Sequence, residues 1–242
     1  MTIIDAHAHI GGTDTPDRLI GLMDEVGIAR AVVTTYADVP GPGDALGQLR
    51  DAVARYPDRL IGFPRMDPRY GRRAVELFAR SVRDEGMRGL KLHPVSNLSF
   101  PYERTTLALL DRAAELDVPV LIHSGDELLC TPQEIAEAAR QTRATILMAH
   151  IGGYQNAHAA LEAAVQNDNI RLETSACPYP SVIQAAVDQL GAERVVYGSD
   201  MPPANPRVEL AKIEILDLTD DQREMILGRN IAELVNISED RP

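Results

Sequence analysis

Residues 3–10 read Ile-Ile-Asp-Ala-His-Ala-His-Ile, an apolar run that carries two histidines two positions apart. In an extended strand alternate side chains share one face, so the rings of His7 and His9 should lie side by side. Two neutral imidazole nitrogens at that spacing are good ligands for a divalent transition metal. Asp5 falls on the same face one step earlier, where a carboxylate could orient a ligand instead of binding the ion. The stretch therefore predicts a buried first strand that ends in a metal-binding pair.

Short β-branched runs alternate with helix-period segments along the rest of the chain. The expected strands are residues 3–9, 30–35, 59–65, 88–93, 118–123, 145–150, 170–174 and 194–198. The expected helices are residues 16–27, 44–56, 71–85, 102–117, 131–141, 154–167 and 180–190, followed by C-terminal helices at 207–217 and 219–235. Such alternation predicts an α/β fold with a parallel sheet and right-handed crossovers.

Eight strand–helix units in 242 residues match a single (β/α)8 TIM barrel domain that spans residues 1–242. A doubly wound open sheet is the alternative. The dinucleotide fingerprint G-x-G-x-x-G and the Walker phosphate-binding sequence are both absent from the sequence, so no nucleotide-binding motif supports that alternative.

Composition and charge exclude several kinds of partner. Asp and Glu number 36 against 24 Lys and Arg, and the net charge of −12 disfavours nucleic acid and anionic membrane surfaces. The apolar runs are strand-sized, and the first strand begins too soon after Met1 to leave room for a signal peptide. Cys130 and Cys177 fit no C-x-x-C pattern, so neither a disulfide nor a thiolate zinc site is indicated. We expect a cytoplasmic protein that acts on a small molecule.

Polar side chains close several of the predicted strands. His9, His93, His123 and His150 end the first, fourth, fifth and sixth strands, and Asp200 ends the eighth. In a barrel these ends meet at one face, where the βα loops build active sites. Each histidine alone could be a hydrogen-bonded core residue, and Asp200 could cap a helix. Their common position at one edge favours a shared site.

Two basic residues are directed toward the same edge. Lys91 shares a face with His93 and points inward, where an unpaired ammonium group would be costly. We expect it to pair with a carboxylate such as Glu173 or Asp5, or to help bind substrate or metal. Arg65 ends the third strand and is a candidate for holding a substrate carboxylate, with a surface position as the alternative. His93 either lines the substrate pocket or has a structural role.

Five segments resemble the amidohydrolase superfamily. They are Asp-Ala-His-Ala-His at 5–9, Gly-Leu-Lys-Leu-His-Pro at 89–94, Ile-His-Ser-Gly at 122–125, Ala-His-Ile-Gly-Gly at 149–153 and Tyr-Gly-Ser-Asp-Met-Pro at 197–202. The most similar branch groups metal-dependent hydrolases with enzymes that resemble aminocarboxymuconate-semialdehyde decarboxylase. The motifs occur in the expected order and span the whole chain.

The resemblance implies a (β/α)8 barrel with one divalent metal ion, usually zinc. His7 and His9 would be ligands from the first strand, His123 from the fifth and Asp200 from the eighth. His150 would act as acid, base or substrate-polarising group. A second ion would need a bridging carboxylated lysine or a glutamate at the end of the fourth strand. Lys91 lies two residues short of that end, which favours one ion.

The leading functional prediction is hydrolysis of an amide, lactone or ester-like bond in a small molecule. A bound metal ion would lower the pKa of a water molecule toward about 7. Asp200 could accept the proton, and His150 could stabilise the charge that develops on the carbonyl oxygen. Metal-dependent decarboxylation of a small carboxylic acid would use the same residues and is the second prediction.

Two further classes stay open. A deoxyribonuclease of the TatD type would suit the H-x-H start, but the charge of −12 disfavours DNA and His93 stands where that group would offer a glutamate. A catalytically inactive metal-binding barrel would not need both Asp200 and His150. The βα loops are shorter than in many relatives, which leaves the substrate open, and a homo-oligomer is a possible assembly.

Overall fold

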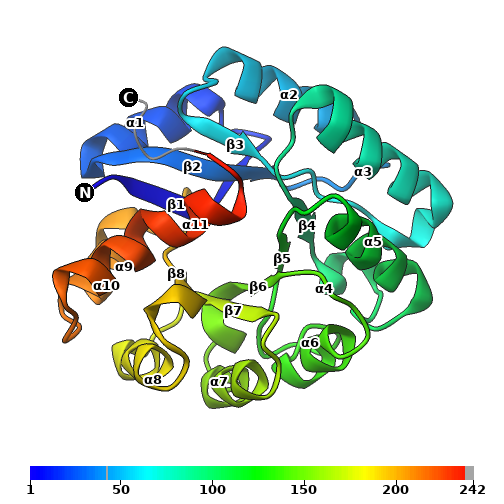
Figure 1. Ribbon diagram of the computed structural model, residues 1–242. Helices are drawn as coiled ribbons and strands as arrows, with labels where there is room; N and C mark the ends of the chain where they lie inside the picture. The colour runs from blue at the N-terminus through cyan, green and yellow to red at the C-terminus, as the bar shows by residue number, and fades with distance from the viewer. Residues whose placement is uncertain (42, 238–242) are drawn as a thin grey trace.

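The computed structural model describes residues 1–41 and 43–237, and within these ranges the chain forms eight parallel strands inside a ring of helices (Figure 1). The strands are β1 Ile3–Ile10, β2 Ile28–Thr35, β3 Leu60–Gly62, β4 Leu90–Leu92, β5 Val120–Ile122, β6 Ile146–Met148, β7 Ile170–Glu173 and β8 Val195–Val196. The helices are α1 Pro16–Val26, α2 Ala45–Arg55, α3 Arg72–Glu85, α4 Pro94–Asn97, α5 Arg104–Glu115, α6 Pro132–Ala139, α7 Ala157–Gln166, α8 Pro180–Leu190, α9 Pro206–Glu214, α10 Asp220–Glu224 and α11 Asn230–Leu234. Short helical turns are η1 Pro68–Tyr70, η2 Ala149–Gly152, η3 Ala192–Arg194 and η4 Met225–Arg229.

Backbone hydrogen bonds join the strands into a closed barrel. The ladders run β1-β2-β3 and β4-β5-β6-β7-β8. Beyond β3, the amide of Lys91 donates to the carbonyl of Pro64 at 3.0 Å and links the two ladders. On the other side, the amide of His9 donates to the carbonyl of Met201 at 2.8 Å, just after β8. These links complete the (β/α)8 fold that the sequence predicts.

The apolar residues form two clusters, one outside the sheet and one inside the barrel. The outer cluster packs the helices against the strands. The inner cluster is built from residues in or directly after the strands and from α11 with the residue that follows it, and α11 contacts β1 and β8. Its members are Ile4, Ala6, Val32, Ile61, Phe63, Leu121, Leu147, Ala149, Val196, Ile231, Ala232 and Val235. The interior is therefore a packed core, and α11 closes the amino end of the barrel.

Gly89 leaves room for the largest side chain of this inner core. A Cβ atom at this position would lie 2.3–2.5 Å from three ring atoms of Phe63. We expect Gly89→Ala to destabilise the protein by about 1–3 kcal/mol, since overpacking forces side chains or backbone to move. Gly21→Ala is the matched control, because nothing lies within 4 Å of the added carbon in helix α1, and it should be neutral or stabilising. Urea unfolding of both variants measures the difference, and equal stabilities would contradict this packing account.

Several predicted boundaries differ from the structure. Strands β3 to β8 are two to four residues long and shorter than the apolar runs, because those runs continue into loops beyond the ladder. The segment predicted as one helix at 219–235 contains a π-helical turn between α10 and α11. Helix α4 was not predicted. Both cysteines are free and buried, in agreement with the absence of a disulfide. Among the described residues, no helix has the length and apolar character needed to span a membrane.

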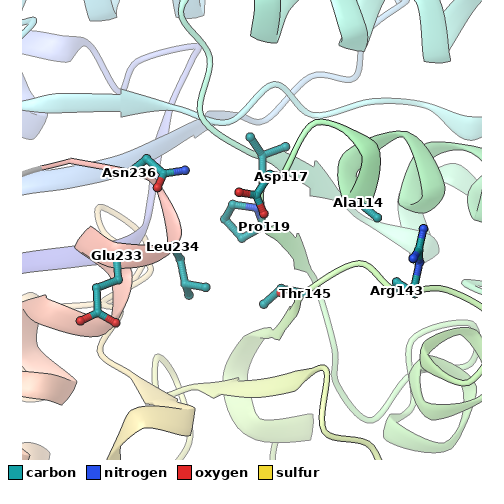
Figure 2. Close-up of a pocket in the computed structure, with 9 residues that line it drawn as sticks. Ala114, Asp117, Pro119, Arg143, Thr145, Glu233, Leu234 and Asn236 are labelled. Atoms are coloured by element: carbon teal, nitrogen blue, oxygen red, sulfur yellow. The ribbon is translucent and has the colours of Figure 1, made fainter.

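A small cavity lies at the amino end of the barrel. It has a volume of about 150 Å³ and is bordered by the segments that lead into β5 and β6 and by the end of α11 (Figure 2). The polar groups around it include Asp117, Arg143 and Glu233. This end of a barrel contributes to stability, whereas active sites form at the carboxyl ends of the strands.

Candidate active site

The carboxyl ends of the strands surround a second cavity of about 180 Å³. Five of the six histidines line it, together with Tyr36, Arg65, Lys91 and Asp200. Every residue that the sequence placed at the site therefore reaches this one cavity. The concentration of titratable groups in a buried concave space marks it as the candidate active site.

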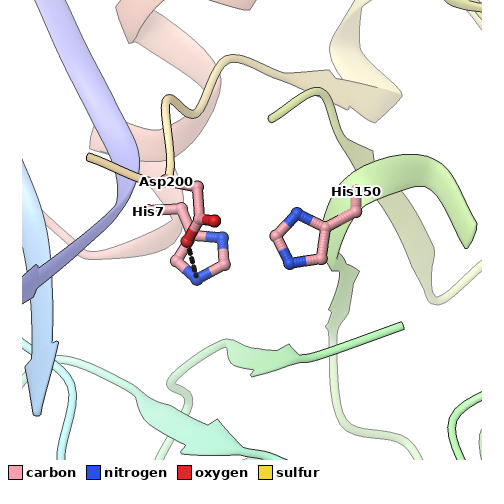
Figure 3. A group of neighbouring side chains, drawn as sticks. All are labelled: His7, His150 and Asp200. Atoms are coloured by element: carbon pink, nitrogen blue, oxygen red, sulfur yellow. Dashed lines mark ion pairs between the residues drawn. The ribbon is translucent and has the colours of Figure 1, made fainter. Parts of the chain in front are cut away.

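His7, His9 and Asp200 bring three donor atoms together. Nε2 of His9 lies 3.2 Å from Nε2 of His7 and 2.9 Å from Oδ1 of Asp200. Nε2 of His7 lies 3.6 Å from the same carboxylate oxygen. Figure 3 shows His7 and Asp200 with the ring of His150, which also offers a nitrogen within 4.8 Å of donor atoms of both residues. The two histidines of β1 and the aspartate that follows β8 therefore place their donor atoms next to one another.

The protonation states of this group suit metal binding. Burial lowers the pKa of His7 and of His9 below the usual range, so both rings are neutral near pH 7. Burial alone would raise the pKa of Asp200, but His7 and the hydrogen bond with His9 outweigh it and the pKa is lowered. The cluster therefore presents neutral nitrogens and an ionised oxygen, as metal ligands must.

Glu173 orients His7. The Nδ1 of His7 donates to Oε2 of Glu173 at 3.0 Å, which leaves Nε2 as the lone pair directed into the cavity. A Cβ at Gly198 would lie 2.1 Å from Oε1 of Glu173, so glycine makes room for this carboxylate. Asp5 does not take the orienting role considered for it. The register of β1 shifts after Asp5, and its Oδ1 accepts the amides of His7 and Ser199, each at 2.9 Å.

The same glutamate also reaches His150 through a serine. Oγ of Ser175 donates to Oε2 of Glu173 at 2.8 Å and accepts from Nδ1 of His150 at 2.9 Å. Because Nδ1 carries the proton in this arrangement, Nε2 of His150 is the free nitrogen. It lies 3.2 Å from Nδ1 of His123. Glu173 and Ser175 on and after β7 thus fix two imidazoles at once.

Two site residues have an unusual backbone conformation. His150 has φ 63° in η2, instead of closing β6 as an extended residue, and Asp200 has φ 57°. A positive φ costs a non-glycine residue on the order of 1–3 kcal/mol and is concentrated at functional sites. The amide of Gly152 donates to Oγ of Ser124 at 3.1 Å and helps to hold the turn. The strain directs both side chains toward the cavity.

His123 and His93 form a second pair of rings. They stack with centroids 4.0 Å apart and an angle of 7° between their planes. Nδ1 of His93 accepts the amide of Ser96 at 3.3 Å, which makes His93 the N-cap of α4 as well as a wall of the cavity. Burial lowers the pKa of His93 to about 3. His123 lines the same cavity as the His7, His9 and Asp200 group, and the ring of His150 lies next to it.

The two basic residues differ in how they are paired. Arg65 is buried, which excludes the alternative of a surface position. Its Nε donates to Oδ1 of Asp38 at 2.6 Å. Lys91 is fully buried, and its Nζ donates to Nε2 of His7 at 2.9 Å. Among the described residues no carboxylate lies within ion-pair distance of Lys91, which excludes the first of its two alternatives, a pairing with Glu173 or Asp5. Burial lowers the pKa of Lys91 to about 7.

Tyr36, which the sequence did not single out, holds His9 from the other side. Its ring stacks on His9 with centroids 4.9 Å apart and planes 4° apart. The hydroxyl group donates to Oδ2 of Asp14 at 2.8 Å. His9 has no hydrogen-bond partner at Nδ1 within residues 1–41 and 43–237. Aromatic stacking therefore positions His9, whereas a carboxylate positions His7.

The donor set fits a divalent ion. An ion with tetrahedral bonds of about 2.0–2.1 Å requires ligand atoms ~3.3 Å apart, and the three atoms of His7, His9 and Asp200 lie 2.9–3.6 Å from one another. Both imidazole nitrogens and carboxylate oxygens bind zinc and manganese. A further ligand would come from His123 or His150, which are the next donors along the cavity.

Glu173→Gln tests the orienting contact. The amide keeps the volume of the carboxylate but removes its charge, so we expect metal affinity to fall by about 10–100-fold. Equilibrium dialysis against a competing chelator measures it. Glu162→Gln, an exposed change in α7, is the matched control and should leave affinity unaltered. Equal affinities for both variants would exclude an orienting role for Glu173.

The chain belongs to the amidohydrolase family, whose sequence pattern matches residues 4–237. No protein of curated function matches it by sequence. Several solved structures share the fold. A dihydroxybenzoic acid decarboxylase from a Polaromonas species with bound manganese is 18% identical, with 97% of each chain covered and a TM-score of 0.75. A 5-carboxyvanillate decarboxylase from Sphingomonas paucimobilis is 13% identical, covering 98% of this chain and 99% of that chain, with a TM-score of 0.78.

A third similar structure is described as a hydrolase and not as a decarboxylase. It is a probable 2-pyrone-4,6-dicarboxylic acid hydrolase from Acinetobacter baumannii with citric acid bound. It is 17% identical, covers 98% of this chain and 100% of that chain, and has a TM-score of 0.73. At these identities the likeness establishes the (β/α)8 fold.

Proposed function

We propose that this protein is a metal-dependent decarboxylase of a small carboxylic acid. The observation that carries the proposal is Lys91, a fully buried amine with no carboxylate partner among the described residues, in the same cavity as the His7, His9 and Asp200 group. A buried amine is costly to charge unless an anion joins it. A substrate carboxylate would supply that anion.

The similar structures support an acid as substrate. Their descriptions name a dihydroxybenzoic acid, a carboxyvanillate and a pyrone dicarboxylic acid, and each of these carries a carboxyl group. Two of the three are decarboxylases, so decarboxylation replaces hydrolysis as the favoured reaction. The cavity of about 180 Å³ suits an acid of small size.

The chain's own residues would act as follows. Lys91 and Arg65 bind and orient the carboxyl group at the β3 and β4 side of the cavity. The ring of His150 is held through Nδ1 by Ser175, and its free Nε2 takes up a proton from solvent and passes it to the carbon that bears the carboxyl group. The bond to the carboxyl carbon then breaks, carbon dioxide leaves, and the proton takes its place. His7, His9 and Asp200, with His123, would hold the divalent ion, which supplies electrostatic stabilisation of substrate oxygen atoms.

Hydrolysis of a lactone or ester of such an acid is the second candidate, because one similar structure is described as a pyrone hydrolase. The product separates the two reactions. The metal-loaded protein is incubated with a panel of hydroxybenzoic acids and pyrone carboxylic acids in isotopically labelled water. We expect carbon dioxide, with solvent hydrogen at the vacated carbon. Labelled oxygen in the product without carbon dioxide would overturn decarboxylation in favour of hydrolysis.

A further inference from the structure

The loop between β5 and α6 holds a second group of metal-binding side chains. His123, Glu127 and Cys130 each offer a donor atom, and these atoms lie within 4.8 Å of one another. Sγ of Cys130 lies 3.6 Å from Oε2 of Glu127. The three residues come from one stretch of eight, so the cluster forms without long-range rearrangement. Sequence reasoning missed it because neither cysteine belongs to a C-x-x-C pattern.

The loop is held in place from both sides. The amide of Gly125 donates to the carbonyl of Cys130 at 3.2 Å and closes the loop. The carboxylate of Asp126 accepts backbone amides from the next βα loop, with Gln155 at 2.7 Å. Its other donors there are the amides of Tyr154 and Asn156. These contacts hold the backbone of the segment that carries Glu127 and Cys130.

The charges around the thiol favour a cation. Burial and the neighbouring Glu127 raise the pKa of Cys130 to about 12, so the free thiol is protonated and unreactive. The negative charge that keeps the proton on sulfur also attracts a divalent ion, and a coordinating thiol is deprotonated outright. Imidazole, carboxylate and thiolate together suit zinc and its close analogue cobalt.

We propose that His123, Glu127 and Cys130 form an outer binding site for a divalent cation of the zinc type, separate from the His7, His9 and Asp200 group. Binding forms a bond from the metal to Sγ of Cys130 and releases the thiol proton to solvent. His123 is shared, because its Nδ1 lies 3.2 Å from Nε2 of His150 in the cavity. An ion at the outer site therefore competes with the inner site for one imidazole.

Cobalt reports directly on this site, because thiolate ligands give Co²⁺ an intense charge-transfer absorption that nitrogen and oxygen ligands lack. We titrate the full-length protein with CoCl₂ and follow the ultraviolet spectrum. The band should appear as the outer site fills, and ZnCl₂ should abolish it by displacing cobalt. Cys130→Ser should remove the band. Cys177→Ser is the matched control and should retain the band, since Cys177 is the other buried free cysteine and belongs to no such cluster within the part of the chain that the structure describes.

Glu127→Gln gives a second measurement that does not depend on a buried substitution. Glu127 is exposed, so this variant should fold. We expect its affinity for cobalt, measured from the charge-transfer absorption, to fall by at least ~10-fold. Absence of the band from the wild type, or its persistence in Cys130→Ser, would overturn the proposal. Should Cys130→Ser fail to fold, an unchanged affinity in Glu127→Gln would overturn it. None of these readouts requires catalytic turnover.

Discussion

Removal of the divalent ion should lower the release of carbon dioxide by at least ~10³-fold. Stabilisation of charge by a bound ion is worth several kcal/mol, and about 1.4 kcal/mol corresponds to each factor of ten in rate. His7, His9 and Asp200 converge with atom separations of 2.9–3.6 Å, and the basic groups of the same cavity, Lys91 and Arg65, are assigned to the carboxyl group of the substrate. Carbon dioxide release is measured before and after dialysis against a chelator, once a substrate has been found.

Restoration separates loss of the ion from damage to the protein. Readdition of MnCl₂ or ZnCl₂ should recover activity, and the more effective ion identifies the cofactor. Circular dichroism on the dialysed protein should be unaltered, because the barrel core does not depend on the site. Full activity of a metal-free sample, verified by elemental analysis, would contradict the proposed role of the ion.

Asp200→Asn should lower turnover by at least ~10²-fold, because it removes the charged member of the group that would hold the ion, and stabilisation by the ion is worth several kcal/mol. The amide cannot be ionised, so it does not balance the charge of the ion. The backbone should tolerate the change, because asparagine adopts the positive φ of 57° at this position readily. The amide of residue 200 keeps its bond to the carbonyl of His7 at 2.8 Å.

The measurement compares turnover with metal content. We expect Asp200→Asn to retain part of its bound metal through the histidines while turnover collapses. Asp84→Asn, an exposed change in α3, is the matched control and should be fully active. Wild-type turnover in metal-loaded Asp200→Asn would rule out the proposed role of this carboxylate as the charged group beside the ion.

The sequence was sufficient to predict the barrel, because hydrophobic periodicity alternates between the strand and helix repeats along the chain. It also located the cavity, since polar residues at the carboxyl ends of parallel strands converge in any closed barrel. His7, His9 and Asp200 meet as that rule requires. The alternation within β1 failed at Asp5, because a register shift turns its carboxylate toward the amides of His7 and Ser199.

The supporting contacts could not be predicted. Glu173 was considered as a partner for Lys91 and instead binds His7, because the choice between neighbouring imidazole and ammonium groups depends on side-chain geometry. Ser175 and Tyr36 carry no sequence signal of their own, and they matter only through the rings they touch. Such supporting residues can be identified only from the contacts that the candidate metal-binding side chains make in the structure.

Anomalous X-ray scattering from crystals grown with MnCl₂ or ZnCl₂ tests the central claim most directly. The account predicts a peak between Nε2 of His7, Nε2 of His9 and Oδ1 of Asp200 at the carboxyl end of the barrel. A metal-loaded crystal with no peak among these three side chains would contradict it.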